Sequence, residues 1–275
     1  QLLFWTFVCT VIIGVIAAKN LNSGLEKACK FMMPALFIML ITVVIRSVTL
    51  PGAAEGIKWY LNVDFSKVTP QTFLTALGQC FFSVGIASGG AFVYGSYLKK
   101  DSNIPEDGLM VVGFDTLAAL LAGFATFPAV FALGLKPDSG SNLLFVTMSN
   151  VFMNMPFGQV FGFMFFLLMF FAALSSALGY LEPISASFSD MMKLSRAKGT
   201  IYALVSIFVV GLSTIFGLNI MSGVKVLGKN LFDFADYLSG NIMMPLGAIA
   251  LILYVLFVWK FDNFKEDVNV GAKGL

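Results

Sequence analysis

Residues 81–97 read FFSVGIASGGAFVYGSY, and GIASGG at 85–90 interrupts an apolar stretch long enough to cross a membrane. Glycine in a helix interior costs about 1 kcal/mol relative to alanine, and three of these six residues are glycine. Freed backbone groups at membrane depth are tolerated only where they line a cavity or are buried in protein. The stretch predicts a broken helix beside a cavity, or a glycine face for close packing through the Gly85 and Gly89 spacing.

The composition is that of an integral membrane protein. Of 275 residues, 58% are hydrophobic and 12% are charged, against about 25% charged in a soluble domain, and the mean hydropathy is +0.89. The apolar runs are about 20 residues long, which predicts helices and not the alternating strands of a membrane barrel. We therefore predict an all-α polytopic membrane protein. The net charge of +2 does not indicate a nucleic-acid partner, and histidine is absent.

Seven membrane spans are predicted, at residues 2–18, 31–50, 70–98, 108–135, 157–189, 201–218 and 240–260. Of the 17 basic residues, eleven fall on one side and six on the other, so the first side is expected to be cytoplasmic together with the tail at 261–275. The chain opens inside an apolar run with QLLFW and no signal-peptide n-region, so we expect a fragment. Residues 141–160 are semi-apolar and predict either a short helical hairpin or a surface loop.

Polar residues inside the spans are candidates for a site. A carboxylate such as Asp115 costs at least about 2.5–3.5 kcal/mol in a membrane, unless it lies near a helix end and reaches water. Ser175 and Ser176 could face a cavity or bond to the preceding helical turn. Glu182 and Asp190 are two turns apart and share a face, which could instead be a solvated helix end.

Two other function classes fit the residues poorly. A membrane enzyme could draw only on carboxylates and serines such as Ser175, Ser176 and Asp115, and no serine elbow motif flanks them. A passive channel needs a continuous polar pore, whereas the polar positions cluster near one depth. Neither an enzyme nor a passive channel is therefore expected.

Six blocks resemble the neurotransmitter:sodium symporter family, especially its bacterial amino-acid transporters. They read KACKFMMPALF, LPGAAEGIKWYLNVDFSKVTP, ALGQCFFSVGIASGGAFVYGSYLKKDSNI, DTLAALLAGFATFPAVFA, FFLLMFFAALSSALGYLEP and DFADYLSGNIMMPLGA. The resemblance implies two inverted repeats of five helices, with the substrate between two broken helices. The chain would start in the fourth helix, so that 1–50 ends the first repeat and 70–260 forms the second, within one transmembrane domain. Three earlier helices would be needed to complete the site.

In this resemblance, the region around GIASGG is part of the substrate site. Phe82 resembles an aromatic lid, and the backbone around Phe82 and Ser83 would receive the substrate amine. The side-chain pocket would be lined by Gly85, Ser88, Ser176 and Tyr180.

The resemblance also implies two sodium sites. Ser83 and Asp115 fall on the first, with Gln79 nearby. The carbonyl of Ala172 and the hydroxyls of Ser175 and Ser176 fall on the second, and such oxygen donors suit a hard alkali cation.

A chloride ion is not expected to be required. Asp115 stands where many members of the family carry asparagine, and Ala119 replaces the serine of chloride-dependent members. A fixed carboxylate would repel an anion beside it.

The gates implied by the resemblance are Phe82 and Asp236 outside and Tyr97, Glu182 and Asp190 in the cytoplasm. Together these residues predict a sodium-coupled symporter of a small, hydrophobic or aromatic amino acid, which works by alternating access in the bacterial inner membrane. The alternative is a non-transporting amino-acid receptor or sensor on the same fold, which could lose the ion ligands that are kept here. The sequence makes no prediction of oligomeric state.

Overall fold

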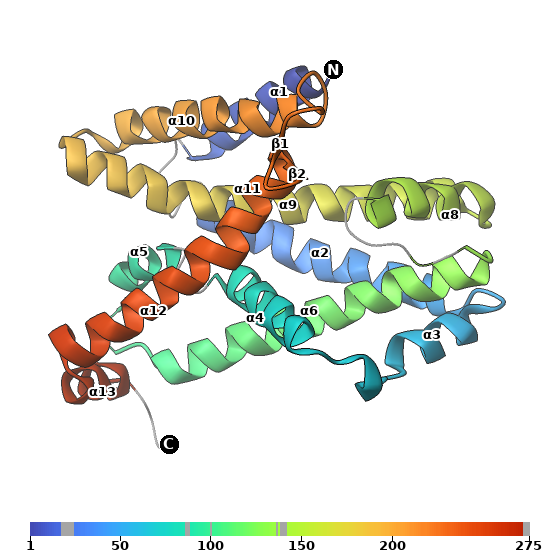
Figure 1. Cartoon of the computed structure of the whole chain (residues 1–275), viewed down its shortest axis with the longest axis horizontal. Helices are drawn as coiled ribbons and strands as arrows, with labels where there is room; N and C mark the ends of the chain where they lie inside the picture. Colours follow the sequence, from blue (N-terminus) through green and yellow to red (C-terminus); the bar gives the residue numbers. More distant parts are fainter. Residues whose placement is uncertain (18–24, 86–88, 100, 136, 138–141, 272–275) are drawn as a thin grey trace. The chain divides into compact units, whose positions relative to one another are not determined.

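The described residues are mostly helical, as the sequence predicts (Figure 1). The computed structural model describes residues 1–17, 25–85, 89–99, 101–135, 137 and 142–271. The elements in chain order are α1 (Leu2–Ala17), α2 (Leu25–Val48), α3 (Ala53–Leu61), η1 (Phe65–Lys67), α4 (Pro70–Val84), α5 (Gly90–Tyr97), α6 (Ile104–Ala132), η2 (Leu143–Thr147), α8 (Met148–Asn154), α9 (Gly158–Met192), α10 (Arg196–Gly217), β1 (Lys225–Val226), β2 (Lys229–Asn230), α11 (Leu231–Tyr237), η3 (Leu238–Met243), α12 (Met244–Tyr254), η4 (Val255–Trp259) and α13 (Phe261–Asn269).

The chain divides into two compact units. Unit 1 consists of Gln1–Glu26, Thr69–Val112 and Ala177–Leu275, and unit 2 consists of Lys27–Val68 and Gly113–Ser176. Helices α6 and α9 each run through both units.

Unit 1 contains the broken helix. Thr69 caps α4 through a capping box with Thr72, and Pro70 occupies the first turn, where its missing N–H costs nothing. The helix ends at Val84 because Gly85 adopts a left-handed conformation with φ 74°, and α5 starts at Gly90 after Gly89 with φ 78°. The predicted break at 85–90 is confirmed, although Ile86, Ala87 and Ser88 lie outside the described residues.

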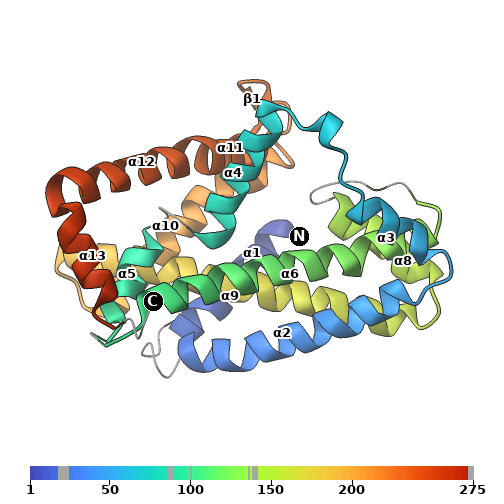
Figure 2. The same cartoon turned by 90° about the horizontal axis from the view of Figure 1, so that it is seen from below.

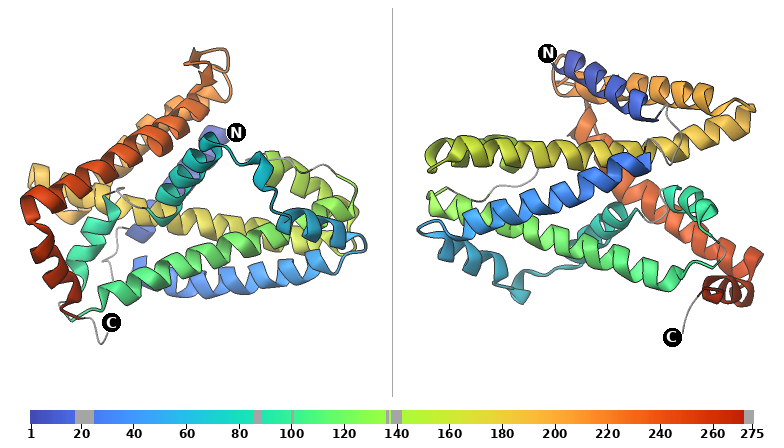
Figure 3. Two further views of the ribbon diagram at one scale, coloured as in Figure 1. Left: turned by 60° about the horizontal axis from the view of Figure 1, so that its bottom comes forward. Right: turned by 180° about the vertical axis from the view of Figure 1, so that it is seen from behind.

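Close helix contacts hold the rest of unit 1. α1 lies beside α10 in both views (Figure 1 and Figure 3, right), where Phe7 meets Phe208 edge to face. α4 packs on η3 and α12, with Gly78 close to Asn241. The chain turns between α12 and α13 (Figure 2), and Lys260, which precedes α13, has φ 70°.

Unit 2 has an apolar core made by α2, α3, α6, α8 and the first half of α9. Helix α3 lies close to α6 because Gly56 has no side chain: a Cβ there would be 2.7 Å from the carbonyl oxygen of Phe127. Gly123 likewise leaves room for the ring of Tyr60, whose hydroxyl donates to the carbonyl of Leu120 at 3.4 Å. Small residues thus permit the close approach, which lets the aromatic side chains fill the space between the helices.

Five helices in the described residues are long and apolar enough to cross a membrane: Lys27–Val48, Ile104–Ala132, Gly158–Met192, Arg196–Gly217 and Leu231–Trp259. They correspond to five of the seven predicted spans. Of the other two, the predicted span 2–18 contains the shorter apolar helix α1, and the predicted span 70–98 contains α4 and α5, one on each side of the break.

Two predictions need correction. The last long helix begins at Leu231 and not near 240, because Asn230 accepts a hydrogen bond from the Asp233 N–H at 2.8 Å and caps a helix that continues through Gly240. The surface-loop alternative for 141–160 is wrong, since Leu143–Asn154 is helical and Met148 and Val151 are fully buried. These apolar side chains are held by the unit 2 core.

Candidate functional site

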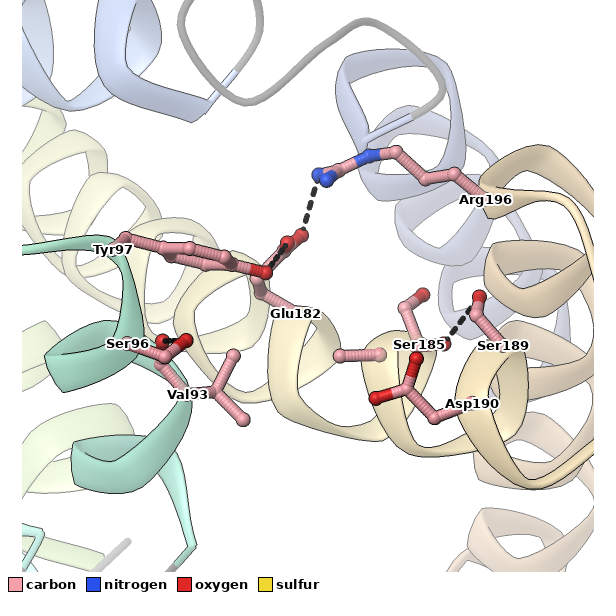
Figure 4. A pocket seen from close by; sticks show the side chains of 9 residues that line it. Val93, Ser96, Tyr97, Glu182, Ser185, Ser189, Asp190 and Arg196 are labelled. Carbon is pink, nitrogen blue, oxygen red and sulfur yellow. Dashed lines mark hydrogen bonds and ion pairs between the residues drawn. The ribbon is translucent and has the colours of Figure 1, made fainter. Parts of the chain in front are cut away.

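A cavity of about 330 Å³ lies between α5, α9 and α10 of unit 1 (Figure 4). Its lining brings together the three residues expected at the cytoplasmic gate, and it adds a basic residue and several small polar ones. The lining residues are Val93, Ser96, Tyr97, Glu182, Ser185, Ala186, Ser189, Asp190 and Arg196. The shared face expected for Glu182 and Asp190 is therefore observed.

Glu182 is the centre of this cavity's polar network (Figure 4). The Tyr97 hydroxyl donates to its Oε1 at 3.1 Å, and Arg196 Nη2 donates to its Oε2 at 2.7 Å. Glu182 is only 8% exposed, so its charge needs a partner, whereas 42% of the Arg196 side chain is exposed. One buried carboxylate thus joins three helices.

Local sequence explains how α10 reaches this carboxylate. A connection of three residues follows Met192, with Lys193 at φ 51°, and returns the chain as α10. Gly199 allows α10 to approach α9, because a Cβ there would collide with Ser189 Oγ and lie 2.8 Å from the Ser185 carbonyl oxygen. At this close approach Ser185 Oγ on α9 donates a hydrogen bond of 3.1 Å to Thr200 Oγ1 on α10.

Sequence reasoning missed Arg196, Ser185 and Thr200. Arg196 entered only the count of basic residues that oriented the chain. The short connection between two apolar segments was the available signal, because it forces the helices to run antiparallel and brings a residue at the start of α10 back toward α9.

Of the six expected substrate residues, Phe82, Ser83 and Gly85 lie at the end of α4, and Ser176 and Tyr180 lie on α9. Phe82 and Ser83 are in the last turn of α4, directly before Gly85, and Phe82 is 46% exposed. Tyr180, 40% exposed, lies on the unit 1 part of α9. Ser176 belongs to unit 2, and Ser88 lies outside the described residues, so the pocket stays a prediction.

The expected second sodium site lies on one turn of α9 in unit 2. Ser175 is buried, and its Oγ donates to the Ala172 carbonyl at 2.9 Å, which is the bond to the preceding turn that the sequence left open. Ser176 is exposed. The carbonyl and the hydroxyl are thus neighbouring oxygens on the same surface of the helix, and both keep lone pairs for a cation.

The remaining predicted residues are dispersed. Asp115 lies about three turns inside α6, in unit 2, so the alternative of a position at the helix end does not apply. Ser83 is in unit 1, and the first sodium site therefore stays a prediction, as does Gln79 beside it. Asp236 is exposed on α11.

Comparisons with known proteins agree on one family. The sequence profile of the sodium:neurotransmitter symporter family matches residues 2–273. An uncharacterised sodium-dependent transporter of Haemophilus influenzae is 39% identical over 267 residues, which cover 97% of this chain and 58% of that protein. Another, of Bacillus subtilis, is 37% identical over 261 residues, which cover 94% of this chain and 58% of that protein.

A solved structure gives the same result. The crystal structure of MhsT in complex with L-phenylalanine matches with a TM-score of 0.90 and 34% identity, over 98% of this chain and 62% of that one. The chain thus spans a little under two thirds of the length of these relatives. From its sequence profile and its fold, the chain belongs to the sodium:neurotransmitter symporter family, whose members are membrane transporters and not enzymes.

Proposed function

We propose that this chain forms part of a sodium-coupled amino-acid symporter and carries its cytoplasmic gate. The observation that carries the proposal is the network of Tyr97, Glu182 and Arg196, which joins α5 to α9 and α10. α5 is also the second half of the broken helix, so movement at the break and opening of the cavity would be mechanically linked.

The substrate proposed is a small hydrophobic or aromatic amino acid. Phe82 would cover it, and backbone groups at the end of α4 and the start of α5 would bind its charged groups through the partial charges of the helix termini. The L-phenylalanine bound by MhsT supports this class. The earlier helices of the full-length protein would supply the rest of the pocket.

Two sodium ions would drive the cycle. The proposed ligands are Ser83 and Asp115 at the first site and Ala172, Ser175 and Ser176 at the second. Sodium shifts the equilibrium only by the difference in its affinity for the two conformations, so it would stabilise the outward-facing form with the cytoplasmic cavity closed.

Opening to the cytoplasm would then require Glu182 to exchange its partners. Separating α5 and α10 from α9 removes the tyrosine and arginine donors from a buried carboxylate, which is costly until water enters. Asp190 at the cavity wall would help to hydrate the opening, while Phe82 and Asp236 close the external side. The protein would span the bacterial inner membrane several times, with its C-terminal tail in the cytoplasm.

The test is uptake by the full-length gene product in proteoliposomes. We expect an inward sodium gradient to drive accumulation of hydrophobic or aromatic amino acids from a labelled panel, and replacement of sodium by choline to abolish it. Sodium-dependent binding without accumulation would support the receptor or sensor alternative, and uptake that ignores sodium would contradict the proposal.

Chloride independence is tested in the same vesicles. Because the Asp115 carboxylate would repel an anion beside it, replacing chloride by gluconate is expected to leave the uptake rate unchanged. A large loss of rate would contradict this part of the proposal.

A further inference from the structure

The carbonyl group of Gly179 lacks its helical hydrogen bond. In an α-helix it would accept from the N–H four residues later, and that residue is Pro183, which has no N–H. Helix α9 nevertheless continues through Pro183 to Met192. Within a membrane-spanning helix, a carbonyl that loses its helical partner needs another donor wherever bulk water does not reach it.

Tyr94 supplies that donor. Its hydroxyl, on α5, donates to the Gly179 carbonyl oxygen at 2.9 Å in a partly buried position. A Cβ built on Gly179 would lie 3.9 Å from this hydroxyl, which is an ordinary van der Waals distance. The hydrogen bond therefore requires the carbonyl group of residue 179 and does not require that this residue be glycine.

The same alignment places Tyr97 on Glu182. The two tyrosines are three residues apart on α5, their acceptors Gly179 and Glu182 are three residues apart on α9, and each pair is separated by 85 residues along the chain. The half-helix and α9 therefore run parallel in a defined register. One bond goes to the backbone, which cannot rotate away, and the other to a flexible carboxylate.

We propose that Tyr94 is a positioning residue of the cytoplasmic gate, whose hydroxyl takes up the Gly179 carbonyl left open by Pro183 and so sets the register in which Tyr97 meets Glu182. This inference rests on the proposed function. The proline creates an acceptor on α9 without unwinding the helix, and the acceptor is paired only while α5 is docked. The bond therefore favours the closed cavity.

The test measures opening of the cavity in the full-length protein without using transport as its readout. Ala186, which lines the cavity, is replaced by cysteine after the native cysteines have been removed, and the rate of labelling by an impermeant maleimide is measured from the cytoplasmic side in sodium. The native cysteines described in this chain are Cys9, Cys29 and Cys80.

Four gate backgrounds are compared: the parent, Tyr94→Phe, Pro183→Ala and the double variant. Tyr94→Phe is expected to raise the labelling rate about three- to tenfold, the effect of losing one hydrogen bond to a poorly solvated carbonyl. With Pro183→Ala the new N–H can donate to Gly179, so adding Tyr94→Phe should change the rate by less than about twofold. Tyr202→Phe, at an exposed position stacked on Phe188, is the control for a lost hydroxyl.

Two outcomes would overturn the inference: an unchanged rate in Tyr94→Phe, or the same increase with and without Pro183. If Tyr94→Phe does not accumulate as folded protein, recovery of folding in the double variant supports the inference, and failure of both variants overturns it. Failure of the proposed function is a separate result, because it appears as sodium-independent uptake by the parent.

Discussion

Two polar clusters on the same helix are held in opposite ways. Glu182 in unit 1 is bonded by residues of two other helices, which lie 85 and 14 residues away along the chain. Ser175 in unit 2 bonds to Ala172, three residues earlier on α9 itself. The first cluster exists only in the folded protein, and the second needs nothing beyond one helical turn.

The difference teaches how each cluster can work. A buried carboxylate requires partners, so the Glu182 network commits α5, α9 and α10 to one arrangement and must be broken for that arrangement to change. A hydroxyl satisfied by its own helix commits no other element, and its oxygen keeps lone pairs for a ligand. In the function proposed above, the Glu182 network would thus control conformation, and Ser175 and its neighbours would hold an ion.

The largest expected effect comes from removing the arginine partner. Arg196→Gln leaves Glu182 buried without its charged donor, a loss of about 1.5–3 kcal/mol, and sodium-driven uptake by the full-length protein is expected to fall more than about tenfold. The exposed Lys198→Gln removes the same charge from α10 and is the control. Adding Glu182→Gln to Arg196→Gln should restore part of the uptake. A double variant no better than the single one would show that the pair is not coupled.

The next largest effect is expected from a substitution that disrupts the packing of α10 against α9. Gly199→Ala is expected to lower the free energy of unfolding of unit 1 by about 1–3 kcal/mol, because the new methyl group meets Ser189 and the Ser185 carbonyl. Gly211→Ala, on the same helix with open space around it, is the matched control and should be neutral or slightly stabilising. Thermal unfolding of the purified protein in detergent measures both. Equal melting temperatures would contradict the close packing.

The proposed second sodium site at Ser175 and Ser176 is tested by the sodium dependence of uptake. Ser176→Ala removes one proposed oxygen ligand, so the sodium concentration for half-maximal uptake should rise about tenfold. Substrate preference should change less, although Ser176 also lines the expected pocket. Ser187→Ala is the control, because this α9 serine bonds only locally, to the Pro183 carbonyl at 2.8 Å, among its described hydrogen bonds. Equal damage to sodium dependence and substrate preference, or damage to neither, would count against the second sodium site.

The smallest effect concerns a local charge cluster outside the spans. Hydrogen bonds from Ser66 and Lys67 lower the pKa of Asp64 below its usual value. A carboxyl with a lowered folded pKa stabilises the fold above its unfolded pKa, and this contribution is lost as the pH falls through the folded pKa. Asp64→Asn should therefore lower the melting temperature slightly at pH 7 and have no effect once Asp64 is protonated. A larger effect at low pH would contradict the assignment.

Features with a local cause could be predicted from the sequence. The break at 85–90 follows from glycine, whose conformational freedom is a property of single residues. The shared face of Glu182 and Asp190 follows from helical periodicity. The early start of the last long helix at Leu231 was missed because the glycine at 240 indicates a helix boundary, whereas the helix begins at the Asn230 cap and continues through Gly240.

Features that depend on packing could not be predicted from the sequence. Nothing in the residues near Arg196 identifies Glu182 as its partner, since the pairing requires the turn after Met192 and the close approach at Gly199. Tyr94 likewise reads as one aromatic among many until α5 lies against the carbonyl left open by Pro183.

By itself, the sequence determined that this chain is a helical membrane protein with a broken helix, because hydrophobic length and glycine content act on each segment separately. Blocks such as FFLLMFFAALSSALGYLEP also indicated its family. Only the tertiary structure decided which polar groups meet. A buried carboxylate or carbonyl takes whichever donor the packing of distant helices brings within about 3 Å, and that choice is not encoded in any single segment.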